Sequence, residues 1–306
     1  MDILFSKKKK YIVAGLITVT CCLAMVIFPS VALYATQKGI SLWASNVLPA
    51  LLPFFICANF LTQMGVSRLI KPSLFPFAMS VLSGYPMGAK IIGDMRREKQ
   101  ISIKEGKRLI SFCSTSGPTF MIGAVGVGLL NSTWAGIIIA TSHYLGAVIN
   151  GLIYSLFFKN DEYIKPGLTK IVDKGLLELF TDAIFSSFKA LGIILAYVVL
   201  FMFVTDLIHL SGILSFIDSP PLKGLIKGFF EMTVGCGALS ECVGISISWK
   251  CVLCTFCLSW GGLSIIGQSM SMLSGSKIPV TYFVLTKITH SIIAGILALI
   301  MASCML

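Results

Sequence analysis

Long apolar runs separated by short polar clusters make up most of this chain. The runs cover residues 11–28, 41–64, 110–130, 134–158, 183–210, 251–273 and 278–301. Each is close to or above the ~20 residues that an α-helix needs to cross the hydrocarbon core of a bilayer. The pattern therefore predicts an all-α multi-pass membrane protein with seven crossings.

Two further apolar segments, residues 73–93 and 228–248, are rich in glycine or proline. The first contains Gly84, Pro86 and Gly88 within five residues, and its two apolar arms are each too short to cross. Non-helical backbone survives at membrane depth only where protein buries it or where it lines a water-filled cavity. Each segment is therefore predicted to be a re-entrant hairpin.

Polar or glycine-containing interruptions also divide two of the spans, at residues 114–118 and 259–264. The order span, hairpin, broken span, span then occurs twice. Residues 1–40 form a cytoplasmic lysine cluster and an N-terminal anchor helix, 41–158 a first repeat, 159–182 a polar linker and 183–306 a second repeat. One anchor helix followed by three crossings places the second repeat in the opposite orientation, so the sequence predicts an inverted repeat, as in many secondary transporters.

Charge supports this membrane class. Only 12% of residues are charged against 56% in the apolar class, and the net charge of +11 comes from cations clustered beside apolar runs. That placement follows the positive-inside rule and puts the N-terminus in the cytoplasm. The lipid bilayer is thus the expected partner, and nucleic acid is not.

With the breaks expected inside the two hairpins, the chain has four interruptions, at residues 83–88, 114–118, 233–237 and 259–264. They are predicted to form one substrate site near the bilayer midplane, because half-helix ends expose backbone N–H and carbonyl groups there. Lys90 would place a cation beside an anionic solute, although pairing with Asp94 one helical turn away is the alternative. Glu231 and Glu241 are candidates for ion coupling, with solvation at the interface equally open. The predicted substrate-binding residues are Ser83, Gly84, Tyr85, Pro86, Gly88, Lys90, Ser114, Thr115, Ser116, Gly117, Pro118, Thr233, Gly235, Gly237, Ser259, Gly261, Gly262, Ser264 and Gln268.

Other residues that could carry chemistry have a structural interpretation. His143 and His290 hold matching positions in the last span of each half and predict a hydrogen bond across the helix bundle. Cys251, Cys254 and Cys257 share one helical face and predict a helix–helix contact rather than a metal site, since no histidine is near. The sequence contains no GxSxG, Walker or HExxH motif, so we expect no enzyme, cofactor or metal, and transport driven by an ion gradient or running downhill.

Three stretches resemble the sporulation integral membrane protein YlbJ family: LSGYPMGAKI, FCSTSGPTFMIGAVGVGLL and SWGGLSIIGQSMSMLS. The resemblance covers roughly residues 46–301, and the second repeat diverges more than the first. It implies two nucleoside-recognition Gate domains, related to concentrative nucleoside transporters. It also implies a role in sporulation, the transport of dipicolinic acid across the outer forespore membrane of an endospore-forming bacterium.

Two other functions stay open. A nucleoside or nucleobase carrier would use the same fold, with amide side chains at the breaks. A Gate-domain protein without transport activity would be a membrane partner in a sporulation assembly. The sequence leaves open the coupling ion, the direction of flux and whether the protein is a homo-oligomer.

Overall fold

The computed structural model describes residues 2–66, 71, 73–158 and 175–306, and this part of the chain contains helices and no strand. Four helical segments in it are long and apolar enough to cross a membrane: α8 (Thr133–Leu156), α9 (Leu176–Leu210), the broken pair α12–α13 (Ile247–Met272) and α14 (Val280–Met305). A fifth crossing follows if the bent pair of N-terminal helices is taken as one span. The prediction of an all-helical multi-pass membrane protein is confirmed. Most of the predicted linker, residues 159–174, lies outside the described residues.

The N-terminal segment bends sharply at a proline. Helix α1 (Asp2–Ile27) meets α2 (Pro29–Leu42) at 104°. Proline is favoured in the first turn of a helix, where its missing N–H removes no hydrogen bond, so a new helix begins at Pro29. Helix α2 continues through η1 (Trp43–Val47) into α3 (Leu48–Gln63), so this helical run begins earlier than the boundary predicted at residue 41.

Two helical hairpins interrupt the spans. The first consists of α5 (Leu74–Ser83) and α6 (Met87–Arg97), with its turn inside the predicted stretch. The second consists of α10 (Pro220–Phe230) and α11 (Met232–Ser240), eight residues before the position predicted for it. Its first arm contains Pro220 and Pro221, which would interrupt the middle of a helix. These prolines instead begin the helix, and the Ser219 hydroxyl caps it by accepting from the Leu222 amide.

Two spans are broken, as predicted. In the first half, α7 (Ile103–Ile110) and η2 (Thr119–Leu129) are joined by a connection whose residues 111–117 are non-helical. In the second half, α12 (Ile247–Trp260) and α13 (Gly262–Met272) meet at Gly261. Because α7 is short and polar, the first broken span does not reach crossing length by composition, and neither does α3. The seven predicted crossings thus become four or five by this measure.

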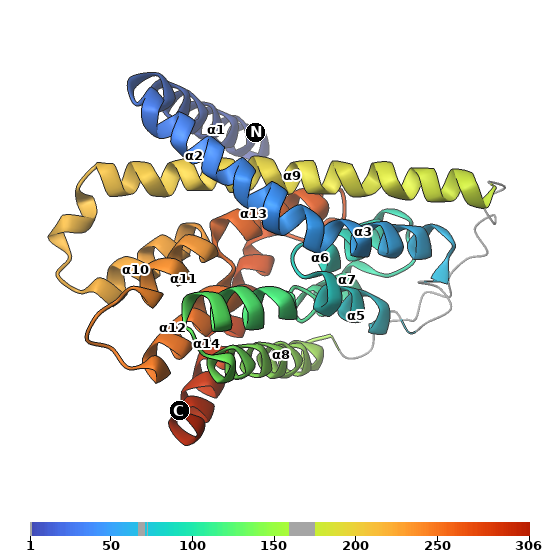
Figure 1. Ribbon diagram of the computed structural model, residues 1–306. Coiled ribbons are helices and arrows are strands. Elements are labelled where there is room, and N and C mark those ends of the chain that lie inside the picture. The colour runs from blue at the N-terminus through green and yellow to red at the C-terminus, as the bar shows by residue number, and fades with distance from the viewer. Residues whose placement is uncertain (1, 67–70, 72, 159–174) are drawn as a thin grey trace.

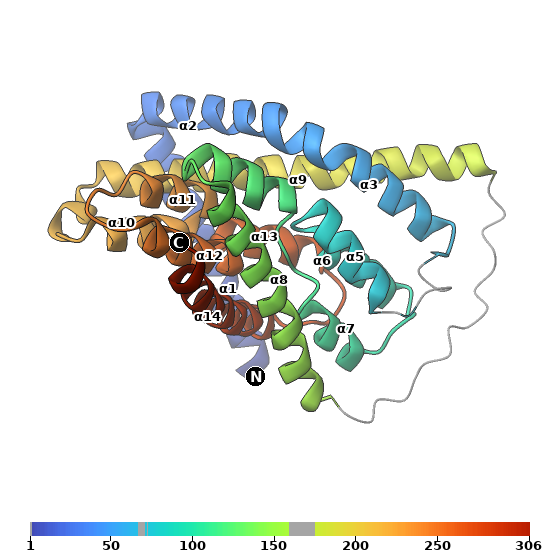
Figure 2. The same cartoon turned by 60° about the horizontal axis from the view of Figure 1, so that its bottom comes forward.

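The elements form one helical body with the two hairpins on opposite sides of it. Helices α8, α12 and α14 pack together, and on the opposite side of the body α2 and α3 run along the length of α9 (Figure 1). The α5–α6 hairpin lies on the side of α3 and the α10–α11 hairpin on the side of α12, and both views agree on this (Figure 2). The hairpins therefore approach the centre from two sides, which is what places their turns at one site.

The predicted inverted orientation leads to a labelling experiment. Lys99 follows the first hairpin and Ser219 begins the second, and both side chains are exposed. Cysteine variants at these two positions, in a background without other cysteines, are expected to react with a membrane-impermeant maleimide from opposite faces. Reaction of both positions from one face would exclude the inverted repeat.

Candidate functional site

The turn of the first hairpin packs directly on the break of the first broken span. Gly84 follows α5 with a φ of +74°, a conformation that glycine adopts without steric cost. A Cβ on Gly84 would lie 2.8 Å from the backbone nitrogen of Gly117. The two non-helical segments are therefore in backbone contact, and side chains at this position would separate them.

Neighbouring side chains satisfy the polar backbone groups that this break exposes. The Ser80 hydroxyl accepts from the Thr115 amide at 3.0 Å, and the His143 Nε2 accepts from the Ser116 amide at 3.0 Å. Tyr144 donates to the Ser116 carbonyl at 3.0 Å. Irregular backbone at membrane depth needs such partners, because lipid offers none.

The predicted histidine contact between the two halves is present. The Nε2 of His290 lies 2.9 Å from the carbonyl oxygen of His143, and the two rings are 4.7 Å apart. The other ring nitrogen of His143 lies 2.8 Å from the Ser259 hydroxyl. Since His143 Nε2 accepts a hydrogen bond from the Ser116 amide, the hydrogen of the neutral ring must be on Nδ1, which donates to the Ser259 hydroxyl.

The second hairpin turns at Glu231, and the predicted break at residues 233–237 is instead helical. The Glu231 carboxylate caps α11 by accepting from the Val234 amide at 2.8 Å, and the Thr233 hydroxyl donates to it at 3.3 Å. Gly235 lies inside α11, and a glycine is needed at this position because the other arm passes close by. A Cβ there would lie 2.2 Å from the Cα of Gly228.

The second break repeats the contact made by the first. Gly261 and Gly262 both have positive φ, +82° and +76°, so the helix ends and restarts within two residues. A Cβ on Gly262 would lie 2.9 Å from the carbonyl oxygen of Phe230, and the Trp260 indole donates to the Phe229 carbonyl at 3.1 Å. In each half, then, the hairpin turn is seated on the broken span.

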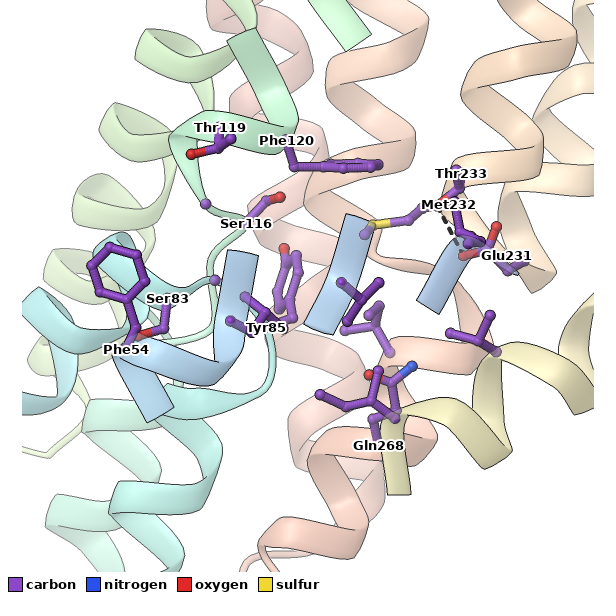
Figure 3. A pocket seen from close by; sticks show the side chains of 18 of the residues that line it. Phe54, Ser83, Tyr85, Ser116, Thr119, Phe120, Glu231, Met232, Thr233 and Gln268 are labelled. Atoms are coloured by element: carbon purple, nitrogen blue, oxygen red, sulfur yellow. Dashed lines mark hydrogen bonds between the residues drawn. The ribbon is translucent and has the colours of Figure 1, made fainter. Parts of the chain in front are cut away.

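Both turns reach one cavity of about 150 Å³, although they are almost 150 positions apart in the sequence (Figure 3). Tyr85 and Glu231 lie on opposite sides of it. Its polar lining comes from Ser83, Tyr85, Ser116, Thr119, Glu231, Thr233 and Gln268. Apolar side chains of the helical run from α2 to α3, and of α9 and α13, complete the wall: Leu42, Val47, Leu51, Phe54, Ile194, Val198 and Ile265.

One polar atom in this lining has no partner in the protein. The Ser83 side chain is buried in the wall of the cavity, and its hydroxyl makes no hydrogen bond within the described residues (Figure 3). An unsatisfied buried hydroxyl costs about 1–3 kcal/mol. A polar ligand in the cavity would remove that cost, so this atom marks where a ligand could bind.

The structure brings part of the predicted residue set to the cavity. Seven predicted binding residues line it: Ser83, Gly84, Tyr85, Ser116, Gly117, Thr233 and Gln268. Glu231, proposed for ion coupling, lines it as well, whereas Glu241 is exposed at the end of α11. The predicted residues that do not line it are Pro86, Gly88, Lys90, Ser114, Thr115, Pro118, Gly235, Gly237, Ser259, Gly261, Gly262 and Ser264.

The structure places Lys90 outside the cavity, so the prediction that it binds an anionic solute there is not what the structure shows. Its ammonium group donates to Asn59 at 2.6 Å and to Asp94 at 3.0 Å, away from the cavity. Positions 90 and 94 share one face of α6, and Arg97 also contacts Asp94, at 2.6 Å. The pairing alternative describes Lys90, and Asn59 on α3 adds a partner that spacing along the sequence could not reveal.

Sequence reasoning missed Lys287. This lysine is 1% exposed in the apolar helix α14. It donates to the Tyr85 hydroxyl at 2.8 Å and to the Ser114 carbonyl at 3.1 Å. The signal was available, because Lys287 is the one lysine, arginine or acid between Pro279 and the last residue, and an ionisable residue in a membrane span indicates function by default.

Glu231 offers a test of the second hairpin. In Glu231→Gln, the amide oxygen still accepts from Val234, so α11 keeps its cap while the negative charge is lost. We expect normal abundance and retained ligand binding, with loss of gradient-driven accumulation if Glu231 carries the coupling ion. The matched control is Glu241→Gln at the exposed end of α11, which should behave as wild type. Accumulation at wild-type level in Glu231→Gln would remove Glu231 from coupling.

Comparison with known proteins identifies a relative. No family model matches the chain, and no solved structure matches it. The chain is 28% identical over 319 aligned positions to the sporulation integral membrane protein YlbJ of Bacillus subtilis (strain 168), covering 89% of this chain and 78% of that protein. This similarity confirms the resemblance of the chain to the YlbJ family of sporulation integral membrane proteins.

Proposed function

We propose that this protein is a secondary-type transporter that moves a small carboxylate anion, dipicolinic acid, across the outer forespore membrane during sporulation. The observation that carries the proposal is the meeting of two hairpin turns, one from each half, at one mainly apolar cavity with a few polar groups in its wall. In membrane proteins, discontinuous helices that meet between two repeats typically form the substrate site of a transporter. The likeness to a sporulation protein supports the biological setting.

The cavity suits a small, flat and polar solute. Apolar side chains from α3 and α9, such as Phe54 and Ile194, can cover the faces of a ring, while hydroxyl and amide groups reach its edge. Dipicolinate has this shape, with a pyridine ring between two carboxylates. The cavity lining, in the described residues, contains no cysteine or histidine and a single carboxylate, so its chemistry supports binding rather than catalysis.

Uptake into proteoliposomes tests this function. Purified protein should give saturable uptake of labelled dipicolinate above protein-free vesicles, with competition by unlabelled dipicolinate and little by nucleosides. A dipicolinate leak that does not saturate, equal to that of protein-free vesicles, would contradict the proposal.

A nucleoside carrier is the second candidate, favoured by the Gln268 amide and the Glu231 carboxylate in the lining. Amide and carboxylate groups can pair with the hydrogen-bonding edges of a base or with ribose hydroxyls. Saturable nucleoside uptake without dipicolinate uptake would establish this candidate. Uptake of neither solute would favour the third alternative, a membrane partner in a sporulation assembly. Whether the protein is a homo-oligomer is a separate measurement.

A further inference from the structure

The side-chain amine of Lys287 is buried in α14, and the proposed function does not yet account for it. It lies 4.6 Å from the centre of the Tyr85 ring and donates to the hydroxyl of the same residue. Its other partner is the Ser114 carbonyl in the first break. Lys287 therefore joins α14 to the hairpin turn and to the broken span, directly behind a side chain that lines the cavity.

No negative charge compensates Lys287 within the described part of the chain. Among the described residues, no carboxylate oxygen lies within 4.0 Å of the Lys287 side-chain nitrogen, so it forms no ion pair there. The groups that contact it are a phenol and a carbonyl. A buried charge without a partner is expensive, and more so at membrane depth.

The cavity lining itself offers no positive charge to an anionic ligand. Among its described lining residues there is no lysine, arginine or histidine, and one carboxylate, that of Glu231. Glu231 lies across the cavity from Tyr85, and its two oxygens are engaged by Val234 and Thr233 (Figure 3). An anion would therefore be favoured at the Tyr85 side, where Lys287 contacts a lining residue.

We propose that Lys287, in its protonated form, supplies the positive charge that makes this cavity select a small carboxylate anion, and that Tyr85 transmits it. The Tyr85 hydroxyl now donates its proton to the Leu258 carbonyl at 3.1 Å while accepting one from Lys287. A carboxylate beside Tyr85 takes the place of Leu258 as acceptor. A hydrogen-bond chain that begins at a cation is strengthened by polarisation, and the low dielectric of the interior lets the charge act across the ring.

This inference rests on the proposed function and deepens it by naming the specificity-determining residue. Its test uses three probes of one shape: dipicolinate, its monoamide 6-carbamoylpicolinate, and the uncharged diamide. Binding is measured by calorimetry on the purified full-length protein in nanodiscs. Wild-type protein should bind the dianion most tightly and the diamide most weakly. That series needs no variant, so it remains informative if a substitution prevents folding.

The variants separate charge from structure. Lys287→Gln keeps a donor for the Ser114 carbonyl but removes the charge, and should lower dipicolinate affinity by about tenfold or more, where tenfold is 1.4 kcal/mol. Affinity for the diamide should stay within about twofold. Lys287→Arg should keep the preference for the dianion. Lys90→Gln, a matched loss of charge outside the cavity, should change neither affinity.

The outcomes distinguish a failure of the proposed role of Lys287 from a failure of the proposed function. A wild-type protein that binds the diamide as tightly as the dianion would overturn the role of Lys287. So would equal losses of affinity for both ligands in Lys287→Gln, which indicate a structural role alone. If wild-type protein binds none of the three probes, the proposed function fails and the inference fails with it.

Discussion

Replacing Gly88 with alanine is expected to remove most of the folded protein from the membrane. Gly88 lies in α6, and a Cβ there would be 1.7 Å from the carbonyl oxygen of Cys113 and 2.9 Å from its carbonyl carbon. These are backbone atoms of the break, so they cannot rotate away as a flexible side chain would. Overpacking of this kind costs about 1–3 kcal/mol and occasionally more, and here it would separate the hairpin from the broken span.

The measurement is membrane abundance together with the thermal midpoint in detergent. Alanine has the higher helix propensity, so a loss of stability would come from the contact and not from the helix itself. Gly237→Ala is the matched control in the second hairpin, because a Cβ at Gly237 has no atom within 4 Å. Normal abundance and an unchanged midpoint for Gly88→Ala would contradict the close approach of the two segments.

Ser83→Ala is expected to weaken substrate binding about tenfold while leaving the protein as stable as before or more so. The Ser83 side chain lines the cavity, and its buried hydroxyl has no partner among the described residues. Removing an unsatisfied hydroxyl relieves a desolvation cost, whereas a hydrogen bond to a charged ligand contributes about 1.5–3 kcal/mol. The two effects therefore have opposite signs.

Ser80→Ala, one turn earlier in α5, is the matched control. The Ser80 hydroxyl accepts from the Thr115 amide at 3.0 Å and contacts the Thr115 hydroxyl at 2.8 Å, so its loss leaves a buried N–H unsatisfied. This variant should lower the thermal midpoint and affect binding only through stability. A Ser83→Ala protein that binds dipicolinate as well as wild type would remove Ser83 from the site.

Much of the membrane architecture can be predicted from the sequence because lipid imposes one simple rule. Every backbone polar group at membrane depth needs a partner, so apolar length alone indicates a helix. The same rule makes glycine and proline within apolar runs informative. It placed the turn at Gly84 and the restart at Gly261–Gly262, where positive φ values are present.

The second hairpin shows where that reasoning stops. Gly235 and Gly237 indicate a break by composition, yet both lie within α11. Glycine is unfavourable in a helix by only about 1 kcal/mol, and at Gly235 the close approach of Gly228 requires it. A glycine that breaks a helix and a glycine that lets two helices touch look alike in a sequence.

The predicted role of Lys90 in binding an anion is not what the structure shows, but its local pairing could be considered from the sequence, whereas distant partners could not. The spacing of Lys90 and Asp94 made their pairing an open alternative, because residues four apart on a helix are neighbours. The contact between Lys287 and Tyr85 joins positions about 200 apart, and no periodicity points to it. The sequence by itself determined the membrane class and the breaks at Gly84, at residues 114–118 and at Gly261, all of which depend on local length and composition. Only the tertiary structure decided which polar groups share the cavity, since that depends on how the two halves pack.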